Sequence, residues 1–426
     1  MKKTKLITSI LLAIGLVGMT GCSLFNDDDI AIKNSYNPHQ ETPEPDADAV
    51  VAGGVAAKED ESVPGALFFK NIPYVEEGNK ITNTYAVGKK NHAGYNVNSG
   101  EDYPSNASSN NYDLYVPGNL VKSDKQTVIL FIHGGAWVSG FKTDVNPYVH
   151  EFANRGYITA TIKYTLLRRT MDDPSLSIFR DLDEIDACIK SMKSVLGELG
   201  FDTSKLSLVI GGASSGAHLS MLYSYSRGQD SAIPIKFIID AVGPTDIKEG
   251  VWQFFKSETD EALDGELTPA SIAAQSAADN LGTLKVAGES YNWDTFHTMK
   301  IANGMCGLPF SLETVQAATD AEESAITDPS NAAYVSMTKD GGGEDQLSVT
   351  YWINHSSNRF DILCAYAGKD TIVGVSQYAN LKAALDAKSI TNDYVYFRDC
   401  GHTNISDDAS HYNTFLTKID NWCKAI

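Results

Sequence analysis

A serine stands at the centre of a run of small residues that could carry nucleophilic chemistry. Positions 212–216 read Gly-Ala-Ser-Ser-Gly, after an apolar stretch at 206–210 and before a helix-compatible segment. The apolar stretch predicts a buried strand, and the small residues let the chain turn sharply into a helix. A serine at the apex of such a turn, Ser214, has an exposed Oγ with a helix N-terminus behind it. The pattern alone is weak, and the strand and helix around it are what strengthen it.

Two further polar groups follow later apolar runs at the expected ends of strands. Asp370 comes soon after the run 360–367, and His402 comes soon after the run 393–397. A serine hydroxyl needs a base to take its proton, histidine serves near neutral pH, and a carboxylate fixes the tautomer of that histidine. The sequence therefore predicts a nucleophile, a base and an acid, with Asp246 as the rival acid.

A further candidate segment lies upstream, where the apolar run 127–132 leads into His-Gly-Gly-Ala-Trp at 133–137. A buried strand that ends in two glycines turns sharply and leaves N–H groups that could hold an oxyanion. The alternative is a simple strand-exit turn, and the serine downstream favours the functional interpretation.

The elements that must position these groups alternate along the chain. Strands are expected at 66–69, 111–117, 127–132, 156–164, 206–210, 235–242, 360–367 and 393–397, and helices around 145–155, 177–199, 378–385 and 412–422. Apolar strands with short connections predict a mostly parallel sheet flanked by helices, with the chemistry beyond the carboxyl ends of the strands. The alternation stops over 247–349, which we interpret as an inserted helical cap.

Together these motifs make the chain resemble the α/β-hydrolase superfamily, and within it the HGG-type esterases. That group includes carboxylesterases, hormone-sensitive-lipase-like esterases and kynurenine-formamidase-like enzymes. The resemblance covers roughly residues 105–246 and 355–426. It implies the α/β-hydrolase fold, with Ser214 as nucleophile, His402 as general base and then acid, and Asp370 as the acid that orients it.

The same resemblance implies an oxyanion hole formed by the backbone N–H groups of Gly135, Ala136 and Ser215. Ala136 departs from the family pattern, because many members have a third glycine there. An alanine still donates its N–H, so the oxyanion hole is expected to survive with a changed loop shape.

The N-terminus resembles the signal peptide of a bacterial lipoprotein. Lysines precede the apolar run 6–18, which is too short to span a bilayer, and Met-Thr-Gly then leads to Cys22. We expect a signal peptide at 1–21, a lipid on Cys22, and export to the cell envelope. The residue after the cysteine indicates the outer membrane, with the domain in the periplasm or at the cell surface.

The remaining chain divides into a tether and a catalytic domain. Residues 22–63 are acidic and contain proline, and they have too few large apolar side chains to fold, so we expect a disordered spacer there. The α/β-hydrolase domain is then expected over 64–426. The oligomeric state stays open.

Composition limits the partners. A formal net charge of −20 argues against nucleic acid and against electrostatic attraction to anionic lipid, so contact with a membrane is expected only through Cys22. The other cysteines are Cys188, Cys306, Cys364, Cys400 and Cys423. No Cys/His spacing suited to a metal occurs, and neither metal nor cofactor is expected.

The sequence thus predicts an exported serine esterase that acts on a small-molecule or carbohydrate-linked ester through an acyl-enzyme. Alternatives on the same fold are an arylformamidase or amidase, and an acetyl or feruloyl esterase of polysaccharides. A non-catalytic binding module is a further alternative, because function does not follow from fold. A peptidase of the prolyl-oligopeptidase type would require a large N-terminal domain, which the tether does not supply.

Overall fold

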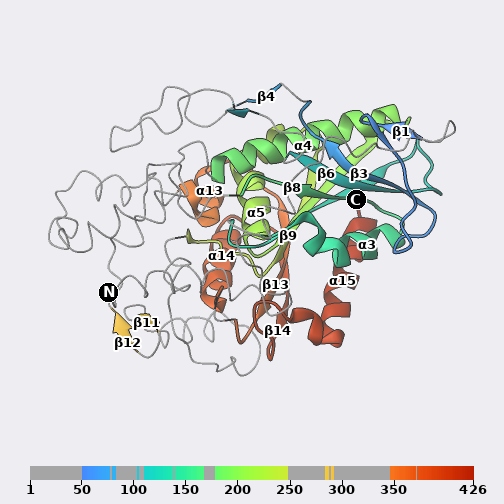
Figure 1. The fold of residues 1–426 in the computed structure, drawn as a ribbon. Helices are drawn as coiled ribbons and strands as arrows, with labels where there is room; N and C mark the ends of the chain where they lie inside the picture. The colour runs from blue at the N-terminus through green and yellow to red at the C-terminus, as the bar shows by residue number, and fades with distance from the viewer. Residues whose placement is uncertain are drawn as a thin grey trace, which may run out of the picture.

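The computed structural model describes residues 50–76, 79–82, 103–104, 110–137, 140–166, 178–247, 284–286, 289–291, 346–370 and 372–426. At its centre is an eight-stranded sheet in the order β14-β13-β10-β9-β7-β8-β6-β3 (Figure 1). Its strands are β3 (Ala66–Pro73), β6 (Asn111–Pro117), β7 (Gln126–Ile132), β8 (Ile158–Lys163), β9 (Leu206–Ala213), β10 (Ile235–Ala241), β13 (Asp361–Ala367) and β14 (Asn392–Phe397).

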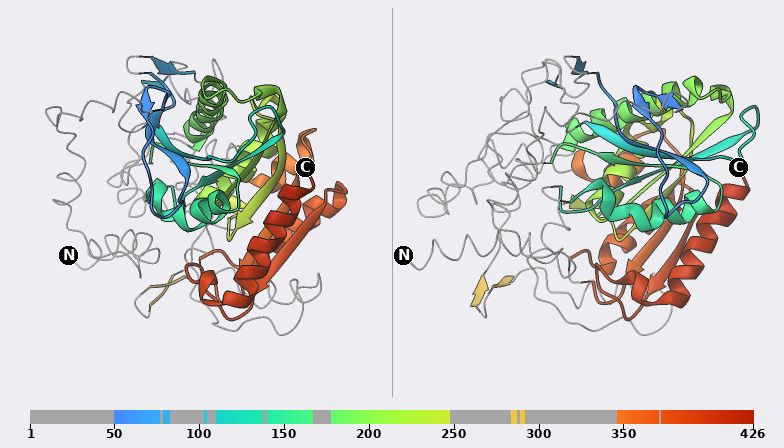
Figure 2. Two further views of the ribbon diagram at one scale, coloured as in Figure 1. Left: turned by 90° about the vertical axis from the view of Figure 1, so that its right-hand side faces the viewer. Right: turned by 45° about the vertical axis from the view of Figure 1, so that its right-hand side comes forward.

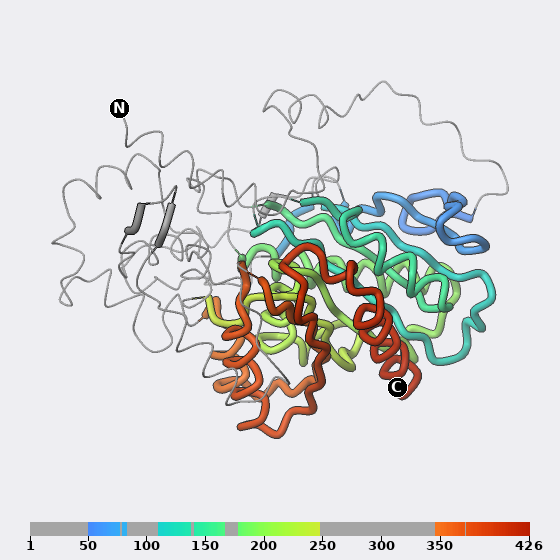
Figure 3. The backbone as a smooth tube through the Cα atoms, turned by 90° about the horizontal axis from the view of Figure 1, so that it is seen from below, coloured from blue at the N-terminus to red at the C-terminus, as the bar shows by residue number. Residues whose placement is uncertain are grey.

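All neighbours from β14 to β8 run parallel, and β6 is antiparallel to both β8 and β3. The predicted α/β-hydrolase fold with a mostly parallel sheet is therefore confirmed. In Figure 3 the chain from β13 onward, coloured orange to red, lies beside the yellow-green part that contains β9 and β10. Segments separated by the long insertion are thus neighbours in one sheet.

Helices cover both faces of the sheet. They are α3 (Asn146–Asn154), α4 (Ile178–Glu198), α5 (Ser215–Arg227), α13 (Val349–His355), α14 (Val375–Ala387) and α15 (Ala409–Lys424). One core cluster joins the sheet to α4, α5, α13 and α14, and the other joins it to α3 and α15. In Figure 2 the green α4 and the teal α3 lie on opposite sides of the sheet. Because both faces are covered, the central strands are apolar throughout, and this is why they stand out in the sequence.

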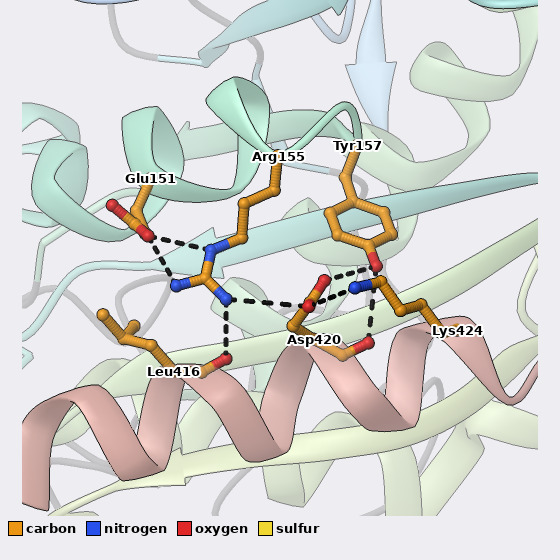
Figure 4. A network of polar contacts seen from close by, with 6 residues as sticks. All are labelled: Glu151, Arg155, Tyr157, Leu416, Asp420 and Lys424. Carbon is orange, nitrogen blue, oxygen red and sulfur yellow. Dashed lines mark hydrogen bonds and ion pairs between the residues drawn. The ribbon is translucent and has the colours of Figure 1, made fainter.

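A polar network fastens the C-terminal helix to α3 (Figure 4). The guanidinium of Arg155, which caps α3, donates to Glu151 of α3 and to the Leu416 carbonyl oxygen of α15, and the Tyr157 hydroxyl donates to Asp420 at 2.8 Å. Exposed ion pairs add little stability, but these contacts supplement apolar packing between the same elements. The loop that carries His402 connects β14, which is paired with β13 in the sheet, to α15, which these contacts hold against the domain.

The ordered domain begins earlier than the sequence predicts. Strands β1 (Val51–Ala52) and β2 (Val55–Ala56) form an antiparallel pair, and Val63 is buried. The Gly53 N–H donates to a carboxylate oxygen of Glu198 at the end of α4. The sequence placed residues 50–63 in a disordered spacer, and that prediction was wrong. Small apolar side chains in this segment pack on the domain, so the ordered domain includes it. The expected signal peptide and the rest of the expected tether lie outside the described residues.

The expected cap at 247–349 lies mostly outside the described residues. Within the described part of it are β11 (Leu284–Val286) and β12 (Glu289–Tyr291), which pair antiparallel. At the base of the insertion, the Ile247 N–H donates to Ser348 Oγ at 3.2 Å and the Thr350 N–H donates to the Thr245 carbonyl at 3.3 Å. The insertion therefore leaves the fold and rejoins it at one place, so the sheet continues undisturbed into β13.

A buried carboxyl lies between β10 and β13, behind the turn that carries the serine. Asp240 Oδ1 accepts the Gly243 N–H at 2.8 Å, and Asp240 Oδ2 lies 2.7 Å from the Tyr366 hydroxyl. That hydroxyl also lies 2.7 Å from the Gly243 carbonyl oxygen. A phenol has one proton and cannot donate to two acceptors, so a protonated Asp240 satisfies all three groups. Burial acts in the same direction and raises the pKa of Asp240 to about 7.

Replacing Asp240 with asparagine should flatten the dependence of stability on pH. The folded pKa of about 7 lies above the ordinary pKa of an aspartate, about 3.9, so the folded state holds the proton more tightly. The free energy of unfolding therefore falls as pH rises between these values, by at most about 1.4 kcal/mol per pH unit. The introduced amide cannot titrate, and its NH₂ group can donate to Tyr366. Urea unfolding of both proteins from pH 4 to 8 measures the difference.

The matched control for this experiment is Asp230→Asn, because Asp230 is an exposed carboxylate. It should leave the pH dependence of unfolding as in the wild type. An Asp240→Asn protein that loses stability with pH as steeply as the control would contradict a protonated Asp240.

Candidate active site

Ser214 occupies a strained turn between β9 and α5. Its backbone has φ 54° and ψ −123°, and the positive φ is costly for a residue other than glycine. Two backbone hydrogen bonds hold the turn: the Ser214 N–H donates to the Ala241 carbonyl at 2.8 Å, and the His218 N–H donates to the Ser214 carbonyl at 3.0 Å. The turn therefore presents the side chain beyond the carboxyl end of β9.

The two glycines of the turn are required by close backbone contacts. A Cβ at Gly216 would lie 2.1 Å from the Ile132 carbonyl oxygen of β7, and a Cβ at Gly212 would lie 2.3 Å from the carbonyl carbon of Gly216. Neither contact is with the far end of a flexible side chain, so neither can relax cheaply. The spacing of glycines around the serine thus follows from packing of the turn against β7.

The structure brings the predicted nucleophile, base and acid into one hydrogen-bonded chain. His402 Nε2 lies 2.8 Å from Ser214 Oγ, and His402 Nδ1 lies 2.7 Å from Asp370 Oδ2. The histidine side chain is 10% exposed and the aspartate side chain is fully buried. A substrate could therefore approach the serine and histidine while the carboxylate stays covered.

Asp370 is held on both oxygens. Its Oδ1 accepts the N–H groups of Ile372 and Val373, each at 2.8 Å, which leaves Oδ2 for His402. A carboxylate only accepts, so His402 Nδ1 carries the proton, and Nε2 has the lone pair that faces the serine hydroxyl. This is the tautomer that a general base requires.

The rival acid Asp246, and Asp399, which is close to His402 in sequence, both make contacts elsewhere. The N–H of Asp246 donates to the Gln377 side chain, and the carboxylate that bonds His402 is that of Asp370. The Asp399 side chain is 66% exposed and pairs with Lys369. Asp370 is thus the acid that the geometry favours.

The loop at 133–137 lies directly against the serine. A Cβ at Gly134 would lie 2.8 Å from the Ala213 carbonyl oxygen and 3.1 Å from Ser214 Cβ. Gly135 and Ala136 have φ values of 121° and 52°, and Ser215 is the first residue of α5. The three N–H groups named from the sequence therefore belong to segments that adjoin the nucleophile, and their role as oxyanion donors stays a prediction.

His133 braces this loop. Its Nδ1 lies 2.8 Å from the Gly134 carbonyl oxygen, and its ring stacks on Tyr164 with centroids 4.4 Å apart. Burial lowers the pKa of His133 to about 4, so the ring is neutral in the neutral pH range. Tyr164 was not identified as a site residue from the sequence. The only feature that pointed to it was its position at the end of the expected strand 156–164.

Within the part of the chain that the structure describes, no group of three or more His, Cys, Asp or Glu residues could hold a metal ion. The described cysteines, Cys188, Cys364, Cys400 and Cys423, are buried and free. Cys22 and Cys306 lie outside the described residues.

Part of this chain is similar in sequence to known proteins. A profile of the BD-FAE family matches residues 112–278, which include the loop at 133–137 and the serine turn. The chain is 25% identical over 138 residues to the non-reducing polyketide synthase atr1 of Stereocaulon alpinum, and 25% identical over 144 residues to the synthase ausA of Aspergillus calidoustus. These matches cover 32% and 33% of this chain, but only 5% and 6% of those proteins.

Among solved structures, an inhibited esterase B from Lactobacillus rhamnosis is 14% identical, with a TM-score of 0.46 over 75% of this chain and 82% of that one. A truncated carbohydrate esterase from gut microbiota is also 14% identical, with a TM-score of 0.49 over 82% of this chain and 100% of that one.

The order and direction of the strands show the fold, and the BD-FAE match covers the segment that carries the serine turn. On these grounds the chain has the α/β-hydrolase fold.

Proposed function

We propose that the protein hydrolyses carboxylic esters through an acyl-enzyme on Ser214. The observation that carries this proposal is the chain of hydrogen bonds from Asp370 through His402 to Ser214 Oγ, at 2.7 and 2.8 Å. A nucleophile, a base in the right tautomer and an acid that orients the base are the parts that acyl transfer requires.

In the first half-reaction Ser214 Oγ attacks the carbonyl carbon of the ester while His402 Nε2 takes the hydroxyl proton. Asp370 stabilises the imidazolium that forms. The negative charge that develops on the carbonyl oxygen is stabilised by the N–H groups of Gly135, Ala136 and Ser215. Removal of one such donor in other hydrolases lowers turnover by about 10²–10³.

Collapse of the tetrahedral intermediate breaks the bond to the leaving group. His402 gives its proton to the departing oxygen, so the alcohol leaves neutral and the acyl group stays on Ser214. Water then enters, His402 takes one of its protons, and attack on the acyl carbon repeats the sequence with the serine as leaving group. The products are one alcohol and one carboxylic acid, and the enzyme is regenerated.

The proposed substrates are small-molecule or carbohydrate-linked esters. Acetyl and feruloyl esters of polysaccharides, and arylformamides, are the alternatives on the same site. The insertion between Ile247 and Ser348 begins and ends beside the carboxyl end of β10, next to the turn that carries Ser214. We therefore expect the side chains of the insertion to determine which of these substrates the site accepts.

A panel of substrates tests the proposal. Purified protein should hydrolyse p-nitrophenyl acetate and butyrate, and a fluorophosphonate should label it on the peptide that contains Ser214. Comparison of octanoate, methyl ferulate, acetylated xylan and an arylformamide then ranks the substrate classes. Failure to hydrolyse any ester, together with failure of the fluorophosphonate to label Ser214, would exclude the proposed function.

We also propose that a lipid on Cys22 anchors the exported protein to the outer membrane. The residues that resemble a lipoprotein signal support this. As a separate finding, none of the described helices is long and apolar enough to cross a bilayer. In cells, the wild type should fractionate with membranes and Cys22→Ala should be released. Release of the wild type by high salt alone would argue against a lipid anchor.

A further inference from the structure

The loop next to the nucleophile holds an unfavourable backbone conformation. Gly135, Ala136 and Trp137 have successive φ values of 121°, 52° and 62°. The left-handed region costs about 1–2 kcal/mol for a residue with a side chain, and two of these three residues have one. Such a conformation persists only where surrounding contacts fix it.

One of those contacts is made by the side chain of Trp137. Its indole Nε1 lies 3.3 Å from His218 Nδ1, and the two rings meet edge to face with centroids 5.2 Å apart. Both residues are buried. His218 lies on α5 one turn after Ser214, and its N–H donates to the Ser214 carbonyl. His218 therefore contacts the turn of Ser214 through its backbone. Through its side chain it contacts the loop 133–137, which we call the oxyanion loop.

The second ring nitrogen of His218 is also bonded. His218 Nε2 lies 2.8 Å from the carbonyl oxygen of Leu347, which precedes α13. A carbonyl only accepts, so Nε2 carries the ring proton and Nδ1 accepts from the indole. Burial lowers the pKa of His218 to about 4, which keeps this neutral form through the neutral pH range. With both nitrogens engaged, the ring has no free position for proton transfer with substrate.

We propose that His218 is a positioning residue that holds the oxyanion loop in place by joining Trp137 to α5 and to the chain at Leu347. This inference rests on the proposed function, because it assumes that the N–H groups of Gly135 and Ala136 stabilise an oxyanion. His218 acts through the loop and touches neither the substrate nor His402. Loss of its bond to Trp137 lets the loop relax away from the geometry that the transition state requires.

Three substitutions separate the two hydrogen bonds. His218→Leu removes both and keeps an apolar side chain of comparable bulk. His218→Asn puts an acceptor near the place of Nδ1 and so keeps the bond from Trp137. His218→Gln can put an amide donor near the place of Nε2 and so keeps the bond to Leu347.

We expect His218→Leu to lower kcat on p-nitrophenyl butyrate by about 10–100-fold, with KM changed less than about threefold, because the loop acts on the transition state. His218→Asn should recover most of the loss and His218→Gln little of it. The acidic limb of the pH–rate profile should stay unchanged in all three, because His402 and Asp370 are untouched. His411→Leu, at an exposed histidine of α15, is the matched control and should keep wild-type kcat and KM.

Trp137→Phe gives an independent test should the His218 variants fold poorly. It removes the indole donor and keeps an aromatic ring, and it should lower kcat to a similar extent. The double variant Trp137→Phe/His218→Leu should lose little more than either single variant, because both remove the same bond. Suppose that a variant has a lower melting temperature and still shows the wild-type kcat at temperatures well below it. That result would show that the contact has a merely structural role, and it would overturn the proposal.

The outcomes of the two proposals are distinguishable. A wild-type protein that hydrolyses no ester removes the proposed function and this inference with it. A wild type that hydrolyses esters, beside a folded His218→Leu protein with unchanged kcat, removes only the inference.

Discussion

Ser214→Ala is expected to lower kcat on p-nitrophenyl butyrate by about 10⁵–10⁶-fold and to abolish labelling by a fluorophosphonate. The reason is that, under the proposed mechanism, Oγ is the atom that forms the acyl bond, and it lies 2.8 Å from His402 Nε2, which takes its proton. The backbone at this position has φ 54°, which is equally strained for serine and alanine. The turn should therefore keep its shape. Steady-state kinetics with purified protein measure the effect.

Ser226→Ala is the matched control for this experiment. Ser226 lies on α5, the helix that follows Ser214, and its hydroxyl donates to the Leu222 carbonyl. It should keep wild-type kcat, KM and labelling. If Ser214→Ala kept more than a hundredth of the activity, or if the label were found on another residue in the wild type, Ser214 would not be the nucleophile.

The groups that the sequence identified come together because of where the strands end. β9, β10, β13 and β14 are consecutive parallel neighbours in the sheet, so their carboxyl ends meet at one edge. Ser214 follows β9, Asp370 follows β13 and His402 follows β14. Parallel order was predictable from apolar runs that alternate with helices, and convergence of these residues follows from it.

Some elements were predictable because their patterns are strong. The continuous apolar run of β7 and the three- and four-residue periodicity of α4 gave bounds within two residues of those observed. The segment 50–63 was missed because its strands have two residues each and contain only valine and alanine. Such short runs give no periodicity, and burial there depends on α4, which comes much later in the chain.

Details of the site required the structure because they depend on contacts between distant residues. The sequence placed His218 one helical turn after the serine, but its partners are 81 and 129 residues away. The positive φ values of Ala136 and Trp137 also have no signal in residue type, since neither is a residue that favours this region. Local sequence pattern therefore finds the candidate catalytic side chains and misses the contacts that hold the loop beside them.

Asp370→Asn should reduce kcat by about 10³–10⁴-fold with little change in KM. The structure fixes which way the new amide points. Asp370 Oδ1 accepts the N–H groups of Ile372 and Val373, so the amide oxygen must stay there and the NH₂ group must face His402. An N–H facing Nδ1 drives His402 into the tautomer with its proton on Nε2, and that nitrogen can no longer accept the proton of Ser214.

Asp399→Asn is the matched control for that substitution. Asp399 lies close to His402 in sequence, but its side chain is 66% exposed and pairs with Lys369 and Arg398. An exposed pair of this kind contributes about 0–1 kcal/mol, so kcat and KM should change less than about twofold. If Asp370→Asn and Asp399→Asn had equal effects, the general electrostatic field of the carboxylates would account for the loss. Because Asp370 acts by fixing a tautomer, we expect the two variants to differ by at least about a hundredfold.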